Sequence, residues 1–123
     1  MEGKYFDVQE IDEITVIRVL EKKLYQNIVT HFQQEMVSLV DDGKRKLVVN
    51  LSEVDIMNSS GLGVLILTWD RLCKEGGNLV IVGLSPLMQE LFERMRLDLI
   101  FTLAASEEEA LGIIRGNKKI PAI

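Results

Sequence analysis

The 123-residue chain has very few of the residues that crosslink small secreted proteins or bind metals, with one cysteine and one histidine. A single cysteine, Cys73, cannot form an internal disulfide, and one distant histidine adds no recognisable metal-binding pattern. We therefore expect no metal or other cofactor, and a reduced, cytoplasmic setting. Helical spacing places Cys73 on the apolar side of its segment, which predicts a small core residue.

Several classes of partner are also disfavoured by what the sequence does not contain. The net charge is −5, with dispersed acidic residues and no basic stripe, so we expect no direct contact with nucleic acid. No apolar run approaches the roughly 18 residues needed to cross a bilayer, and Met1 to Lys4 lead into a strand pattern rather than an apolar leader. These features predict no membrane contact and leave other proteins as partners.

The usual marks of an enzyme are missing as well. The sequence contains neither of the glycine-rich nucleotide-binding patterns, G-x-G-x-x-G and G-x-x-x-x-G-K-[ST]. No G-x-S-x-G elbow surrounds a serine, and no base and orienting group accompany one. We therefore expect a protein that is not an enzyme.

The residues that are present suit one α/β domain. A hydrophobic content of 47% can fill a single core without disulfides or a metal. We expect one domain over residues 1–123, with a core at about 5–115 and a flexible polar tail at 116–123. Strand patterns occupy 5–10, 14–20, 46–51, 78–82 and 99–102, and helical patterns occupy 26–42, 62–74, 86–95 and a segment that opens at Ser106.

Local signals define the ends of these segments. Asp12 and Glu13 form a turn between the first two strands, which predicts a hairpin. Ser85 before a proline predicts a helix start, and Ser106 with Glu109 predicts a capping box whose other glutamates favour the helix dipole. The stripe expected to be buried in the 86–95 helix is Leu87, Met88, Leu91, Phe92 and Met95. Strands that alternate with helices after the hairpin predict parallel pairing in a mixed sheet with about four helices.

The most informative segment runs from Asp55 to Val64, between a buried strand and a helix. Ser59 and Ser60 stand where this helix has to begin, and a serine there can cap the helix with its oxygen. A helix start also tolerates a phosphate well, because its N–H groups and partial charge favour anions. Two glycines follow the serines, although each weakens a helix by about 1 kcal/mol relative to alanine. They indicate close approach of another backbone or freedom to rearrange.

This segment resembles the signature of STAS domains, and most closely that of bacterial anti-sigma factor antagonists, whose loop is Asp-Ser-(Ser/Thr/Ala)-Gly-Leu-Gly. The likeness extends from about Tyr5 to Leu111 and implies an α/β STAS-like domain. In the family a kinase phosphorylates the serine after the acidic residue, which implies Ser59 as the phosphoacceptor, with Ser60 as the second candidate. The resemblance assigns partner binding to Asn58, Ser59, Ser60, Gly61, Leu62 and Gly63.

Two positions depart from the family pattern. Asn58 replaces the acidic residue, so it can orient the neighbouring hydroxyl but cannot accept its proton. Its other interpretation is a turn or cap residue. The loop from Glu21 to Leu24 replaces the family's Gly-Glu-(Leu/Ile)-Asp, which lies near the serine loop in the family fold. This second change leaves the identity of the partner open.

The resemblance implies a regulatory protein-binding module. Unphosphorylated, it would bind an anti-sigma factor serine kinase and so release a sigma factor; phosphorylation on Ser59 would end the binding, and a serine phosphatase would restore it. The alternative is a phosphorylation-independent scaffold or an accessory subunit of a signalling or transport complex. We expect a monomer or a weak homo-oligomer.

Overall fold

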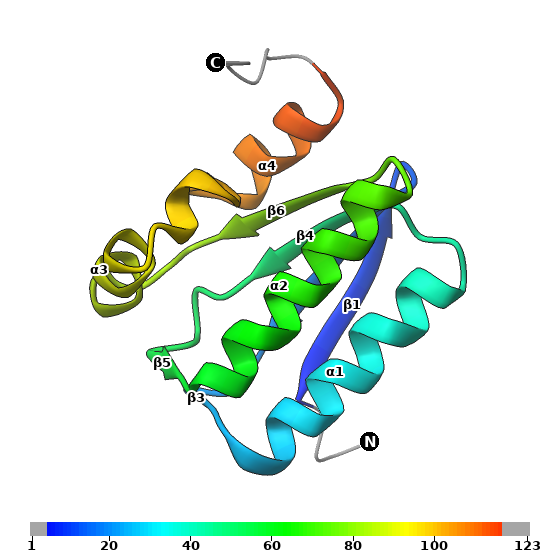
Figure 1. Cartoon of the computed structure of the whole chain (residues 1–123). Helices are drawn as coiled ribbons and strands as arrows, with labels where there is room; N and C mark the ends of the chain where they lie inside the picture. The colour runs from blue at the N-terminus through cyan, green and yellow to red at the C-terminus, as the bar shows by residue number, and fades with distance from the viewer. Residues whose placement is uncertain (1–4, 117–123) are drawn as a thin grey trace.

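The protein is described by a computed structural model over residues 5–116, so all but the first residue of the expected flexible tail lie outside the described residues. A five-stranded sheet in the order β1-β2-β4-β6-β7 forms the centre (Figure 1). The strands are β1 (Phe6–Ile11), β2 (Ile14–Val19), β3 (Lys23–Leu24), β4 (Lys46–Asn50), β5 (Ile56–Met57), β6 (Asn78–Val82) and β7 (Thr102–Ala104). The helices are α1 (Gln26–Asp41), α2 (Ser59–Lys74), α3 (Pro86–Arg94), the short 3-10 helix η1 (Leu97–Leu99) and α4 (Glu107–Ile114).

The sheet is mixed, as the sequence predicts. β1 pairs with β2 antiparallel, and the remaining pairs β2–β4, β4–β6 and β6–β7 are parallel. The hairpin turn is confirmed at Asp12 and Glu13, whose φ angles of 52° and 72° are both left-handed. A two-residue turn with two positive φ angles matches the twist of the strands that it joins.

The two faces of the sheet are covered unequally. Helices α1, α2 and α3 pack on one face over the larger apolar core, which includes Phe32, Leu65 and Phe92. Of the helices in the described part of the chain, only α4 packs on the other face, where Ala110 lies on a smaller core that includes Val48 and Val80. The carboxyl ends of the parallel strands thus lie between two layers of helix, which is where sites form in such sheets.

The short last strand is present, but it begins three residues later than the expected 99–102. Residues Leu97–Leu99 form the 3-10 helix η1, and β7 begins only at Thr102. Arg96, with φ 61°, turns the chain after α3, and the N–H of Phe101 donates to the carbonyl of Leu97 at 2.9 Å. Leu97 and Phe101 are both buried, because residues four apart share one side of a helical turn.

Burial also differs from the sequence prediction at three positions. In the segment expected as the 86–95 helix, Met88 and Phe92 are buried, whereas Leu87 in α3 and Met95 just after it are 56% and 49% exposed. This nine-residue helix presents only a narrow row to the core, so the flanking positions stay outside it. Cys73 is exposed rather than part of the core, because it lies about 100° around α2 from the buried Leu72.

Candidate functional site

The serine loop is attached to the loop that departs most from the family pattern. β3 and β5 form a two-stranded parallel ladder in which Lys23 pairs with Ile56. The N–H of Asp55 donates to the carbonyl of Lys22 at 2.8 Å, and the N–H of Asn58 donates to the carbonyl of Leu24 at 3.3 Å. The Glu21 to Leu24 loop and the serine loop therefore form one continuous surface beside the start of α2 (Figure 1).

Asn58 is the residue that caps α2. Its backbone is extended, and its side-chain Oδ1 accepts a hydrogen bond from the N–H of Gly61 at 2.9 Å. Ser59 and Ser60 are the first two residues of the helix, so the interpretation of a serine as the cap is wrong. The side chain that accepts from a third-position N–H belongs to the residue before the helix, and that residue is the asparagine.

Both serines present free hydroxyls to solvent. Ser59 and Ser60 are exposed, and no hydrogen bond within residues 5–116 uses either hydroxyl. They lie at the amino end of a 16-residue helix, where the unpaired N–H groups and the helix dipole favour a negative charge. The local geometry can therefore accommodate a phosphate on Ser59 without displacing a side chain that is already bonded there.

The other loop residues divide between fold and surface. Leu62 is 4% exposed in the larger core. Gly61 is also buried, and a Cβ there would lie 3.3 Å from the Cβ of Met57. A Cβ at Gly63 would meet nothing within 4 Å. The structure thus brings all six predicted residues together, but it uses Gly61 and Leu62 to pack the loop.

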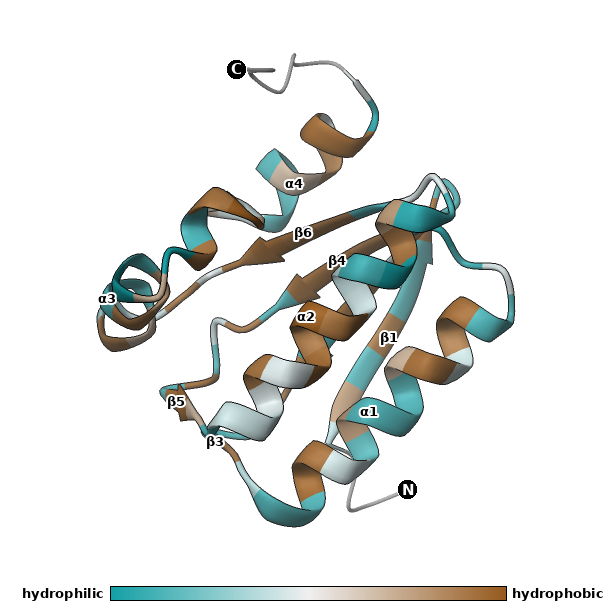
Figure 2. Ribbon diagram, in the orientation of Figure 1, coloured by the Kyte–Doolittle hydropathy of each residue, from teal (hydrophilic) through white to brown (hydrophobic). Residues whose placement is uncertain are grey.

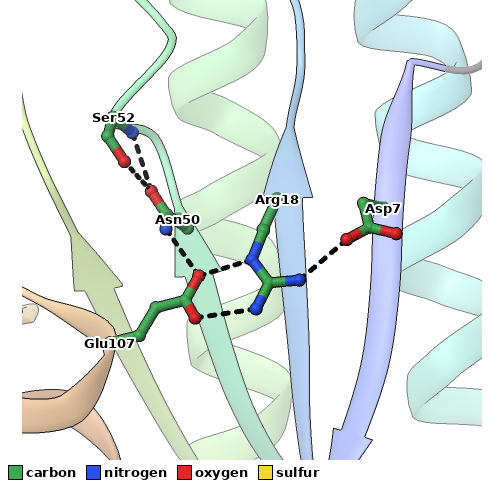
Figure 3. Close-up of polar contacts among 5 residues, drawn as sticks. All are labelled: Asp7, Arg18, Asn50, Ser52 and Glu107. Atoms are coloured by element: carbon green, nitrogen blue, oxygen red, sulfur yellow. Dashed lines mark hydrogen bonds and ion pairs between the residues drawn. The ribbon is translucent and has the colours of Figure 1, made fainter.

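A polar cluster on the α4 face was missed by the sequence interpretation (Figure 3). The Glu107 carboxylate accepts from the Nε and Nη2 atoms of Arg18 at 2.6 and 2.8 Å, and from the Nδ2 of Asn50 at 2.6 Å. Arg18 also donates to Asp7 at 2.7 Å. The hydrogen bonds from Arg18 hold the pKa of Glu107 below its ordinary value, and those carboxylates raise the pKa of Arg18.

This cluster extends to the chain that leads into the serine loop. The Oδ1 of Asn50 accepts from the backbone N–H of Ser52 at 2.8 Å and also from its hydroxyl. Ser52 in turn lies against Gly83, where a Cβ would come within 2.9 Å of the Ser52 Cβ. Arg18 and Asn50 are polar residues near the carboxyl ends of mainly apolar strands, which is the one signal that could have marked the cluster.

Residues 5–116 contain no helix that is both long and apolar enough to cross a membrane. Over the same residues, no three histidine, cysteine, aspartate or glutamate side chains gather as a metal ion would require.

Comparison with known proteins gives a family and named relatives. The profile of the STAS domain matches residues 5–110. BtrV of Bordetella bronchiseptica, a candidate anti-sigma factor antagonist, is 36% identical over 78 residues, which are 63% of this chain and 67% of BtrV. The anti-sigma-B factor antagonist of Staphylococcus aureus is 32% identical over 92 residues, covering 75% of this chain and 76% of the relative.

The solved structures include the same architecture. The anti-sigma factor antagonist SpoIIAA in its unphosphorylated form matches with a TM-score of 0.73 and 24% identity, over 90% of this chain and 98% of SpoIIAA. The phosphorylated form of this Bacillus protein matches with a TM-score of 0.70 over 86% of this chain and 96% of that one. At this identity the likeness establishes the fold.

Proposed function

The chain belongs to the STAS domain family, and from this membership we propose that it is an anti-sigma factor antagonist. The names of the relatives from Bordetella bronchiseptica and Staphylococcus aureus support this function. Unphosphorylated, the protein binds an anti-sigma factor serine kinase that otherwise holds a sigma factor. Phosphorylation on Ser59 ends this binding, and a serine phosphatase restores it.

One observation carries the proposal: Ser59 is an exposed first residue of α2 whose hydroxyl has no partner within residues 5–116. A kinase can reach such a hydroxyl without unfolding the loop. The phosphate adds a charge of about −1.5 to −2 at neutral pH, at a position where the kinase contacts a neutral hydroxyl in the unphosphorylated protein. A penalty of about 3 kcal/mol would lower affinity roughly 150-fold, which is enough for a switch.

The proposed switch acts on the interface and leaves the fold intact. A phosphate at the first residue of a helix interacts favourably with the helix dipole and with the free N–H groups. Asn58, and not Ser59, provides the cap, so modification of the serine leaves the bond to the N–H of Gly61 in place. The phosphorylated protein is therefore expected to stay folded while it loses its partner.

Two substitutions at Ser59 test the proposal. Ser59→Ala should bind the anti-sigma factor serine kinase of the same organism as the parent does, and should gain no phosphate mass with ATP. Ser59→Asp should bind at least about tenfold more weakly, because it places a charge where the kinase contacts a hydroxyl. Ser60→Ala is the matched control and should still be phosphorylated. Equal affinity of Ser59→Asp and the parent would contradict the switch.

A second function is favoured by one residue. Asn58 replaces the carboxylate of the family loop, and its Oδ1 is already occupied by the N–H of Gly61. The protein would then be a phosphorylation-independent scaffold or accessory subunit that uses the same surface. A stable complex with the kinase that never gains phosphate mass would support this alternative.

A further inference from the structure

The exposed part of the serine loop is too small to form a stable interface by itself. A specific complex buries about 800 Å² on each partner, or about 20–30 residues. Of the six predicted contact residues, Gly61 and Leu62 are buried in the protein itself. Any partner that covers Ser59 must therefore contact more of the surface, and two features of α2 indicate where.

The first feature is a glycine that the fold does not require. Gly63 lies inside α2 without a left-handed φ angle, and a Cβ there would meet nothing within 4 Å. Glycine weakens a helix interior relative to alanine, so Gly63 destabilises α2 and no contact within the described residues requires the missing side chain. Gly61 differs, because its missing side chain makes room for Met57. Gly112 in α4 is open in the same way, but Gly63 lies one turn from Ser59, where its missing side chain leaves room for another backbone to approach the helix closely.

The second feature is an exposed leucine one turn further along. Leu67 is 64% exposed, and residues four apart are neighbours on a helix surface, so Ser59, Gly63 and Leu67 form one row. Leu67 borders a groove of about 90 Å³ between α1 and α2. The groove is lined mainly by apolar side chains, which include Met36, Val37, Val40 and Val64. In Figure 2 the first turn of α2 is pale and its middle turns are brown, beside the parallel course of α1.

We propose that the partner that binds at Ser59 also occupies this row and groove through an apolar segment. The backbone of the segment passes over Gly63, and an apolar side chain enters the groove beside Leu67. Eight residues of helix separate Ser59 from Leu67, about 12 Å, so a partner of ordinary interface size spans both. This inference rests on the proposed function, because the row begins at the residue that the kinase must reach.

Matched glycine substitutions test the close approach. Gly63→Ala is compared with Gly112→Ala, a glycine of α4 on the other face of the sheet whose Cβ would also meet nothing within 4 Å. Both variants should unfold at higher urea concentration than the parent, because alanine favours a helix. Only Gly63→Ala should weaken binding to the same serine kinase, by about tenfold or more, with Gly112→Ala within about twofold of the parent.

A second pair of variants tests the apolar contact. Leu67→Ser should weaken kinase binding about tenfold, whereas Leu99→Ser, at a leucine of η1 that is 72% exposed, should not. If Gly63→Ala and Leu67→Ser bind like the parent while Ser59→Asp does not, the row is wrong and the proposed function stands. If the parent itself fails to bind, both are overturned. Self-association that Leu67→Ser abolishes would assign the row to a second copy and overturn the inference.

Discussion

Asn58 determines how the serines are presented. Its Oδ1 holds the N–H of Gly61 at 2.9 Å, its carbonyl accepts from Leu62 at 3.2 Å, and its own N–H binds the carbonyl of Leu24. The first two bonds stabilise the first turn of α2, and the third connects it to the β3–β5 ladder. Aspartate has the same shape and caps a helix equally well, so the fold alone does not explain an asparagine here.

We expect Asn58→Asp to increase the rate of Ser59 phosphorylation by about tenfold or more. The carboxylate keeps one oxygen on the N–H of Gly61 and provides a second that can orient the hydroxyl and accept its proton, an effect that is typically worth about 10²–10⁴-fold. The measurement is a kinase assay at saturating ATP, with affinity followed separately. Asn58→Ala is the control: it should lose about 0.5–2 kcal/mol of stability with the cap. Equally rapid phosphorylation of parent and Asn58→Asp would show that the carboxylate is dispensable.

Among the elements, α4 depends most on polar contacts. It has eight residues, and its first residue, Glu107, makes a bidentate ion pair with Arg18 of β2 and a hydrogen bond with Asn50 of β4. Asn50 also holds Ser52, in the segment that leads to the serine loop. Through Asn50, the Glu107 carboxylate thus connects α4 on one face of the sheet with the segment that leads to the serine loop and α2 on the other face.

We expect Glu107→Gln to lower the free energy of unfolding by about 1–3 kcal/mol at pH 7, because hydrogen bonds to charged groups have roughly this value. Arg18 holds the pKa of Glu107 below its ordinary 4.5, so the carboxylate stabilises the fold fully above about pH 4.5. That stabilisation is lost as the pH falls through the lower folded pKa.

Urea titrations of parent and variant at pH 7 and at descending pH below 4.5 measure the effect. The difference between the two proteins should be largest at pH 7 and should shrink in acid. Glu108→Gln is the matched control, since it removes the same charge from an exposed position in the same turn. A difference that stays constant down to acid pH would show that the ion pair with Arg18 does not act as described.

In the whole molecule, stability is distributed unevenly between the two faces. Among residues 5–116, the core under α1, α2 and α3 contains 23 buried residues, and the core under α4 contains six. Regions with fewer buried apolar contacts open at lower free energy than the whole protein unfolds. The face with α4 is therefore expected to open first.

Native-state hydrogen exchange should show this order. Amides of α4 from Leu111 onward should exchange through an opening that costs less than global unfolding, whereas those of Val48 and Val49 in β4 should exchange only with global unfolding. In Glu107→Gln the α4 amides should exchange faster still. The same opening free energy for α4 and β4 would mean that the two layers unfold as one unit.

Elements whose signals are local could be predicted from the sequence. The hairpin turn at Asp12 and Glu13, the caps at Ser85 and Ser106, and the helix that follows the serines all rest on residues within four positions of each other. The family was also predicted, because its signature is a short run from Asn58 to Gly63.

Other features depend on residues that are far apart in the sequence. Helical periodicity predicted that Leu87, Met95 and Cys73 are buried. They are exposed because the core contacts only a narrow row of each helix, and the periodicity does not give the width of that row. The sequence placed Glu107 at a helix start, where a glutamate is common. Its ion pair could not be predicted, because its partner Arg18 lies 89 positions away.

The sequence by itself therefore determined the α/β architecture, the family and the place of Ser59 at the start of a helix, since neighbouring residues set helix starts, turns and periodicity. Only the tertiary structure decided that the Glu21 to Leu24 loop pairs with the serine loop, that Gly63 faces open space and that Glu107 joins α4 to the sheet. Whether a side chain is buried, bonded or free depends on which distant segments pack beside it. The neighbours of each side chain are determined only when the sheet and the helices pack together, because a close-packed interior allows one arrangement of the side chains.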